Sequence, residues 1–460
     1  MWGSDVRQRL VVSCALVLVG VIFVSATRAW NPRSGGRSAS FPPRVVSGDE
    51  PHYLLTTNAL LRGDGFSVRA GYARVRAGST EAGLRFAGSS LDHHTLLLAP
   101  GLSSPERWQE AYQISKPRPC PTPECTPFTP TSVDFDALPG VREIPAHPLA
   151  FPLLVAALLR PFSLEADRVE TVAITWNAVL AWLATVAIYG AARASAFSRP
   201  SALAVALVCG LASPLLAYGR SFFPEVAIGC ALAVAAWLFF RGRLALSGAA
   251  CAVAFALKPP FALAGVGLVA DRLLARQWGE ALRLAASLAG GVTVVLVMNQ
   301  LIARTPLISG VTRWVWARGL DGLRSTLLES TSGLLPFVPW AAVSLGAALL
   351  GVVRPGAPGA PPRPGRALGL GVLATVVLLA LRGEGAGDCW GPRYWVGWCP
   401  WLALLAVDLA RRGGRLRVIA VGVLVAWAIP VALAGAFRYP DVWGRTPIET
   451  VRAQWRWFPW

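Results

Sequence analysis

The sequence predicts an all-α membrane protein of about eleven transmembrane helices, with a long extracytoplasmic loop after the first helix. Three observations predict this fold class. The 460-residue chain is 54% hydrophobic and only 15% charged, with a mean hydropathy of +0.50, which is too apolar for a soluble protein of this size. Apolar runs close to the length of a membrane span recur along the chain. Arginines gather in alternate connections between these runs, as the positive-inside rule requires.

The apolar runs give the elements in chain order. Arg7 and Arg9 precede the first run, at about 10–24, which is either a signal peptide or a first span with a cytoplasmic N-terminus. Both interpretations place the next segment outside. Ten further runs follow at about 169–190, 201–217, 224–240, 244–257, 260–270, 281–303, 333–353, 367–382, 394–410 and 416–436.

A shorter apolar stretch, from Pro148 to Leu159, closes the first loop. At about a dozen residues it is short for a span and predicts a helix at the membrane surface. Counting it as a span would invert every later helix and move the arginine clusters outside, so we exclude that topology. The clusters of the predicted cytoplasmic loops are Arg193 and Arg199; Arg241 and Arg243; Arg272, Arg276 and Arg283; Arg354, Arg363 and Arg366; and Arg411, Arg412, Arg415 and Arg417.

This topology divides the chain into four parts: a first transmembrane helix (1–27), an extracytoplasmic loop with juxtamembrane helices (28–167), a ten-helix transmembrane bundle (168–436) and an extracytoplasmic aromatic tail (437–460). Tryptophans of the tail are expected to anchor in the headgroup region. The net charge of +18 lies in short clusters between apolar runs, so it is a topology signal and predicts no nucleic-acid partner.

Ionisable residues gather at the predicted outer ends of the spans, although they lie far apart in sequence. Such groups are costly at membrane depth unless they are paired or hydrated, so we expect a shared polar cavity at the outer interface. The residues concerned are Asp49, Glu50, His147, Arg168, Arg220, Glu225, Lys258, Asp388 and Arg393.

Several short motifs among these residues resemble one family in the same chain order. The stretch GDEPHYL at 48–54, directly after the first span, resembles the first-loop acidic motif of the GT-C superfamily. These are polytopic glycosyltransferases that use polyprenyl-phosphate sugars, among them the protein O-mannosyltransferases and the lipid A aminoarabinose transferases. Further similar elements are AHPL at 146–149, which lacks the family's second proline, Arg168 at the entry of the second span, YGRSFFPE at 218–225, LKP at 257–259, GLLPF at 333–337 and GPRY at 391–394.

The resemblance implies transfer of a sugar from a polyprenyl-phosphate donor to a lipid, glycan or protein acceptor, with inversion at the anomeric carbon. Asp49 occupies the position of the family's catalytic acid and is expected to act as general base, while Glu50 orients Asp49 or binds a sugar hydroxyl. The phosphate departs as an anion, so cations and not a general acid must assist it. The candidate phosphate-binding residues are Arg220, Lys258, Arg393, Arg168 and His147.

The remaining polar residues have less definite roles. Glu225 is expected to pair with Arg220 rather than react, and Asp388 is a candidate second acid for the acceptor. His147 either binds phosphate or caps the surface helix. Asp49 and Glu50 could instead be N-terminal caps of an amphipathic helix.

No metal centre is predicted, and no cofactor is required by this chemistry. Adjacent His93 and His94, after Asp92, are interpreted as part of a polar loop. Asp49 and Glu50 could hold a divalent cation or work without one. Cys120 and Cys125 either form a disulfide or stay free.

The resemblance places the protein in a bacterial plasma membrane as a multi-pass protein with its site on the extracytoplasmic side. Two other functions stay open. A transporter or lipid flippase would be expected to show charged mid-membrane residues and matched halves, which the sequence lacks. A non-catalytic assembly protein with the same fold is disfavoured only by the retained acids and cations. The segment between Gly65 and Ile144 resembles nothing that we could align.

Overall fold

A computed structural model describes residues 2–27, 49–76, 90–98, 106–113, 142–164, 166–308, 319–354, 363–381, 390–438 and 444–455. Most of these residues are helical, as the sequence predicts, and they form two compact units. The first, called the bundle unit, comprises Met1–Pro43, Ile174–Thr293 and Val311–Trp460. The second, called the loop unit, comprises Arg44–Ala173 and Val294–Gly310. The loop unit therefore includes residues 294–310, which the predicted division assigned to the transmembrane bundle.

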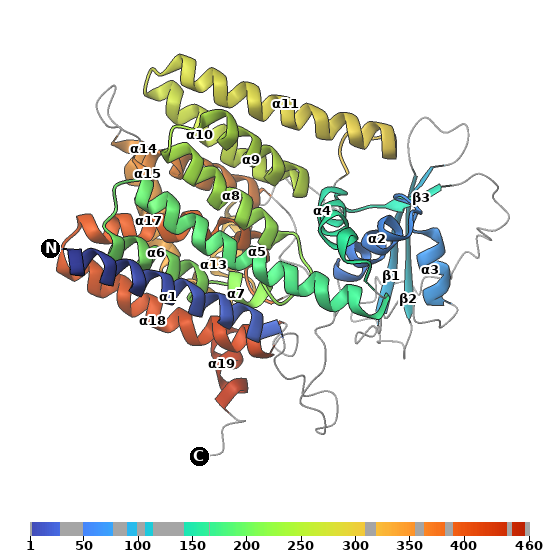
Figure 1. Ribbon diagram of the computed structural model, residues 1–460, viewed down its shortest axis with the longest axis horizontal. Coiled ribbons are helices and arrows are strands. Elements are labelled where there is room, and N and C mark those ends of the chain that lie inside the picture. Colours follow the sequence, from blue (N-terminus) through green and yellow to red (C-terminus); the bar gives the residue numbers. More distant parts are fainter. Residues whose placement is uncertain are drawn as a thin grey trace. The chain divides into compact units, whose positions relative to one another are not determined.

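The bundle unit is built from helices alone among its described residues (Figure 1). Within it α1 packs against α6, and α18 packs against α17. Its elements are α1 (Trp2–Thr27), α5 (Ala166–Ala194), α6 (Arg199–Leu211), α7 (Leu215–Tyr218), α8 (Glu225–Phe240), α9 (Leu244–Leu257), η5 (Pro259–Phe261), α10 (Ala262–Leu274), α11 (Trp278–Ala303), α12 (Gly319–Leu328), α13 (Leu334–Phe337), α14 (Ala341–Val353), α15 (Pro364–Ala367), α16 (Gly369–Ala380), η7 (Arg393–Trp398), α17 (Cys399–Arg412), α18 (Arg415–Arg438) and α19 (Pro447–Trp455), with α5 and α11 each contributing an end to the loop unit.

Within the described ranges, four helices are long and apolar enough to cross a membrane: Asp5–Thr27, Arg168–Ala194, Trp278–Ala303 and Arg415–Phe437. The most apolar windows of α11 and α1 are poorly buried by protein, at 17% and 22%, whereas that of α5 is 50% buried. Helices of membrane-spanning length with outward apolar faces are typical of contact with lipid. The number of eleven spans stays a prediction, because the other apolar helices of the described residues are shorter than a bilayer requires.

The first helix is integrated into the bundle unit. Trp182 Nε1 of α5 donates to the carbonyl oxygen of Leu16 at 2.9 Å, and Arg199 of α6 forms an ion pair with Asp5. These contacts favour the interpretation of residues 10–24 as a span over a signal peptide.

Small residues and tryptophans hold the bundle helices together. The Nε1 groups of Trp340 and Trp401 donate to the carbonyl oxygens of Ala212 and Leu232, each at 2.7 Å. Gly267 of α10 lies so close to α16 that a Cβ atom there would meet the Gly371 nitrogen at 2.4 Å. Close backbone approach at small residues is the usual means by which apolar helices associate in a membrane, where burial of apolar surface supplies little driving force.

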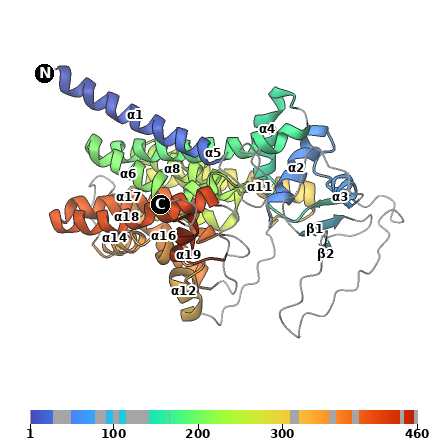
Figure 2. The same ribbon diagram turned by 90° about the horizontal axis from the view of Figure 1, so that it is seen from below.

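The loop unit combines short helices with a small sheet that the sequence did not predict. Three antiparallel strands, β1 (Ser90–Leu98), β2 (Glu106–Gln113) and β3 (Arg142–Pro145), lie in the order β2-β1-β3. The helices α2 (Glu50–Arg62) and α3 (Arg69–Arg76) contact β3 and lie beside the sheet (Figure 2). The core behind the strands consists of Leu96, Leu98, Ile144, Ala146, Leu149, Ala303 and Ile308.

Two predictions for the loop can be compared with this unit. The stretch Pro148–Leu159 contains α4 (Ala150–Leu159), whose ten residues are too few for a span, in agreement with the prediction of a short helix. It continues into the 3₁₀ turn η4 (Arg160–Phe162). The interpretation of Asp92, His93 and His94 as a polar loop is wrong, because these residues lie in β1. Cys120, Cys125, Asp388 and the tail residues Trp443, Trp457 and Trp460 lie outside the described residues.

Candidate functional site

Three of the predicted outer residues meet in the bundle unit. Lys258 Nζ lies 2.7 Å from Glu225 Oε1, and Arg393 Nε donates to the same oxygen at 2.8 Å. The Glu225 side chain is fully buried, that of Arg393 is 6% exposed, and that of Lys258 is 20% exposed. These three side chains, called the Glu225 cluster, have a formal charge of +1 when counted alone.

The elements that carry the cluster bring it to one end of the bundle helices. Glu225 is the first residue of α8, Lys258 follows the last residue of α9, and Arg393 opens η7, which leads into α17. Because α8 and α9 run in opposite directions, a helix start and a helix end meet there. The N-terminus of α8 adds the positive end of its dipole at this position.

Aromatic rings enclose the two cations. Arg393 Cζ lies 4.1 Å from the centroid of the Phe223 ring, and Lys258 Nζ lies 4.8 Å from that of Tyr394. Cation–π contacts of this kind stabilise a charge by about 0.5–2 kcal/mol and exclude water from one side of it. The two cations are therefore held in place by Glu225 and by rings, with the more exposed Lys258 better placed to meet a ligand.

Two residues position the cluster: Asn177, which sequence reasoning missed, and Tyr218, which it named only within the motif at 218–225. Asn177 Nδ2 of α5 donates to the carbonyl oxygens of Ser221 at 2.7 Å, and of Tyr218 and Phe223 at 3.3 Å, which fixes the turn before α8. The Tyr218 hydroxyl donates to the carbonyl oxygen of Trp390 at 2.8 Å and so joins that turn to the segment before Arg393. An asparagine within an apolar run was the available signal, because a buried amide needs hydrogen-bond partners.

Arg220 makes a contact that the sequence did not predict. Its Nη1 donates to the carbonyl oxygen of Ala436, near the end of α18, at 3.0 Å. Glu225 forms ion pairs with Lys258 and Arg393, which the sequence did not predict; its pairing with Arg220 stays a prediction. Arg220 therefore fastens the turn before α8 to the last apolar helix.

The acidic motif lies in the loop unit, where Asp49 is the N-cap residue of α2. Its backbone is already helical, with φ −76° and ψ −15°, and its side chain makes no capping hydrogen bond. A capping role would require that bond, so the cap interpretation of Asp49 is not supported. Asp49 is partly exposed, whereas Glu50 in the first turn is fully buried.

A histidine and tyrosine group surrounds the first turns of α2. His52 Nδ1 lies 2.5 Å from the Tyr72 hydroxyl oxygen, and the rings of His52 and His147 stack at 5.1 Å between centroids. The Tyr53 ring meets His147 at 5.3 Å and Phe151 at 5.4 Å. The N-cap of α4 is Leu149, so His147 is not its capping residue, and it packs against α2 instead. Sequence reasoning did not single out His52 or Tyr72.

The structure thus assigns the predicted site residues to two groups. Asp49, Glu50, His147 and the exposed Arg168 belong to the loop unit, and Arg220, Glu225, Lys258 and Arg393 belong to the bundle unit. Within the described ranges, no three histidine, cysteine, aspartate or glutamate side chains are grouped so that they could hold a metal ion.

Comparisons with known proteins give no match. No protein-family model matches the chain, and neither a curated protein nor a solved structure is significantly similar to it.

Proposed function

We propose that the protein is a membrane glycosyltransferase that moves a sugar from a polyprenyl-phosphate donor to a lipid, glycan or protein acceptor outside the cytoplasm. The observation that carries this proposal is the Glu225 cluster, in which Lys258 and Arg393 share one oxygen of a buried carboxylate. Its two cations lie beside the N-terminus of α8, at a helix end that the positive-inside rule assigns to the outer face.

The cluster has the properties that a phosphate leaving group requires. Charge develops on the phosphate oxygens as the glycosidic bond breaks, and cations fixed beforehand stabilise that charge without reorganisation. Glu225 and the rings of Phe223 and Tyr394 fix both cations before a donor binds. In this proposal Lys258 contacts the phosphate as a point charge and Arg393 through its planar guanidinium group.

Asp49 is the proposed general base. A base must accept a proton from the acceptor; Asp49 is partly exposed, and its carboxylate makes no capping bond to α2. The buried Glu50 and the His52–Tyr72 hydrogen bond hold the start of α2 and so act as positioning groups. The product phosphate needs no proton, so one carboxylate is enough for the transfer.

The direct test is a transfer assay with the purified protein in liposomes. Radiolabelled polyprenyl-phosphate sugars are offered with cell-envelope lipids, glycans and proteins as acceptors, and nucleotide sugars serve as control donors. We expect transfer of label from at least one polyprenyl-phosphate donor and none from nucleotide sugars.

The same liposomes distinguish the alternative functions. Movement of an intact labelled lipid between leaflets, without release of its sugar, would replace the proposal with a flippase. Neither transfer nor movement with a complete donor panel would favour the non-catalytic assembly protein.

A further inference from the structure

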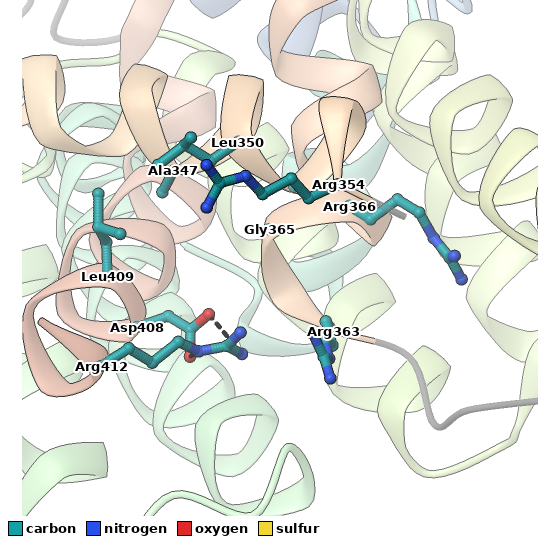
Figure 3. Close-up of a pocket in the computed structure, with 10 residues that line it drawn as sticks. Ala347, Leu350, Arg354, Arg363, Gly365, Arg366, Asp408, Leu409 and Arg412 are labelled. Atoms are coloured by element: carbon teal, nitrogen blue, oxygen red, sulfur yellow. Dashed lines mark hydrogen bonds and ion pairs between the residues drawn. The ribbon is translucent and has the colours of Figure 1, made fainter. Parts of the chain in front are cut away.

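A second charged site lies at the opposite ends of the bundle helices. A pocket of about 160 Å³ opens between the end of α14, the start of α15 and the last turns of α17 (Figure 3). Arg393 precedes α17 and Asp408 lies near its end, so this pocket and the Glu225 cluster are separated by the length of α17. The residues that line the pocket include Arg354, Arg363, Arg366, Asp408 and Arg412.

The acids at this end of the bundle are already shared by arginines. Asp408 pairs with Arg411 Nη2 at 2.9 Å and with Arg412 Nη2 at 2.9 Å. Arg366 Nε lies 2.5 Å from Asp271 Oδ1, and the same buried acid also pairs with Arg272. Asp408 therefore holds two cations and leaves an excess positive charge beside the pocket, whereas the Asp271 group is balanced because Arg272 also pairs with Glu280 at 3.3 Å.

Two lining arginines have no acidic partner among the described residues. Arg354 follows the last residue of α14, and Arg363 precedes α15. Both are exposed, and neither has a hydrogen-bond or ion-pair partner among the residues that the structure describes. Figure 3 shows them with Arg412 around the same pocket, where the dashed line marks the pairing of Arg412 with Asp408.

Membrane topology alone does not explain this arrangement. The positive-inside rule requires arginines in the cytoplasmic connections, but solvated side chains satisfy it. Here four arginines line one pocket, and the Arg366 side chain is only 7% exposed. Gathering like charges costs free energy unless an anion is bound between them, and arginine forks match the oxygens of a phosphate group.

We propose that this pocket binds a phosphate group, with Arg354, Arg363 and Arg412 as its ligands. The apolar helices α14 and α17 end at the pocket, which places it at the height of lipid headgroups if these helices lie in a membrane. The phosphate is supplied either by an anionic lipid headgroup or by a free phosphate anion.

The test measures binding of two probes to the full-length protein in phosphatidylcholine nanodiscs. One probe is labelled phosphatidylglycerol, and the other is inorganic phosphate. Wild type is compared with the double variant Arg354→Gln/Arg363→Gln, which should fold because neither side chain has a hydrogen-bond or ion-pair partner within the described part of the chain. The matched control is Arg415→Gln/Arg417→Gln, which removes the same charge from exposed positions of α18 outside the pocket.

We expect the Arg354→Gln/Arg363→Gln variant to lose at least about tenfold in affinity for the probe that binds, and the control to stay within about twofold of wild type. The reason is that charge-assisted hydrogen bonds depend on the position of the arginine, whereas diffuse electrostatic attraction depends on the total charge. Loss confined to phosphatidylglycerol identifies a lipid headgroup, and loss with inorganic phosphate identifies a free anion as the ligand. Equal losses in both variants, or no effect of the pocket variant with either probe, would overturn the proposal.

Discussion

Arg393 Nε donates to Glu225 Oε1 at 2.8 Å, although the two residues are 168 positions apart. Lys258 Nζ contacts the same oxygen at 2.7 Å, so one buried carboxylate joins the start of α8, the end of α9 and the start of η7. This buried acid therefore stabilises the fold and also fixes the positions of the two cations. Replacing Glu225 by an uncharged residue measures how much the carboxylate contributes to the stability of the fold.

Glu225→Gln should destabilise the bundle strongly. Breaking a buried ion pair by removing one partner costs roughly 3–5 kcal/mol, because the remaining charge stays buried without compensation. Glu280→Gln is the control, since Glu280 is 40% exposed and meets Arg272 at 3.3 Å, a pair worth at most about 1 kcal/mol. Chemical unfolding in detergent measures both free energies. Equal stability of the two variants would show that Glu225 contributes no more than a surface acid.

Asn177 should be sensitive to the exchange of its amide for a carboxylate. Asn177→Asp removes a donor and directs an acceptor at the carbonyl oxygens of Ser221, Tyr218 and Phe223. We expect Asn177→Ala to lose about 1–3 kcal/mol of unfolding free energy and Asn177→Asp to lose more at neutral pH. Thermal unfolding of the three proteins checks the order. An aspartate variant as stable as wild type would contradict the proposed positioning role.

Gly267→Ala should weaken the contact between α10 and α16. The new methyl group would lie 2.4 Å from the Gly371 nitrogen, and overpacking of this kind costs about 1–3 kcal/mol. Gly422→Ala in α18 is the matched control, because its Cβ would meet nothing within 4 Å and alanine favours a helix by about 0.5–1 kcal/mol. Unfolding midpoints should move in opposite directions. If both substitutions raised the unfolding midpoint, the close contact between α10 and α16 would not contribute to stability.

The last described helix should depend on pH through its capping box. The Glu449 carboxylate accepts from the backbone N–H and the hydroxyl of Thr446 at 2.9 and 3.0 Å, and Thr446 Oγ1 accepts from the Glu449 N–H at 3.3 Å. The Thr446 backbone bond, followed by the bond from its hydroxyl, lowers the pKa of Glu449 below its usual 4.5. Ionised Glu449 therefore stabilises α19 above that value, and this contribution is lost as the pH falls through the lowered pKa.

Amide hydrogen exchange across α19 can follow this loss, after correction for the intrinsic pH dependence of exchange. Wild type should lose protection below about pH 4.5, whereas Glu449→Gln should show no such step. A step at or above pH 4.5 in wild type would contradict the lowered pKa.

The sequence predicted the helical regions of the bundle because each apolar run is long and bounded by arginines. It did not predict where a run would break. The run at 333–353 divides into α13 and α14 around Pro339, which cannot donate a helical hydrogen bond. The strand β1 was missed because its residues do not alternate between apolar and polar, and Thr95, Leu96 and Leu98 are all buried.

The site was partly predictable for a physical reason. The predicted topology indicates at which end of a helix each residue lies. It therefore placed Glu225, Lys258 and Arg393 together at the outer ends of the bundle helices. It says nothing about the direction in which each side chain points around its helix axis, so the partners of Glu225 could not be assigned. The contacts of His52 with Tyr72 and His147 depend on packing among α2, α3 and α4, which no local pattern encodes.

The central claim is that Asp49 acts as general base in sugar transfer, and a single-turnover measurement tests it most directly. Wild type, Asp49→Asn and Asp64→Asn are loaded with a radiolabelled polyprenyl-phosphate sugar, and transfer to the acceptor is followed after the donor has bound. Asp64 is an exposed acid after α2 and serves as the matched control. We predict equal donor binding in all three, with transfer slowed about a hundredfold or more in Asp49→Asn alone. Transfer by Asp49→Asn at the wild-type rate would contradict the claim.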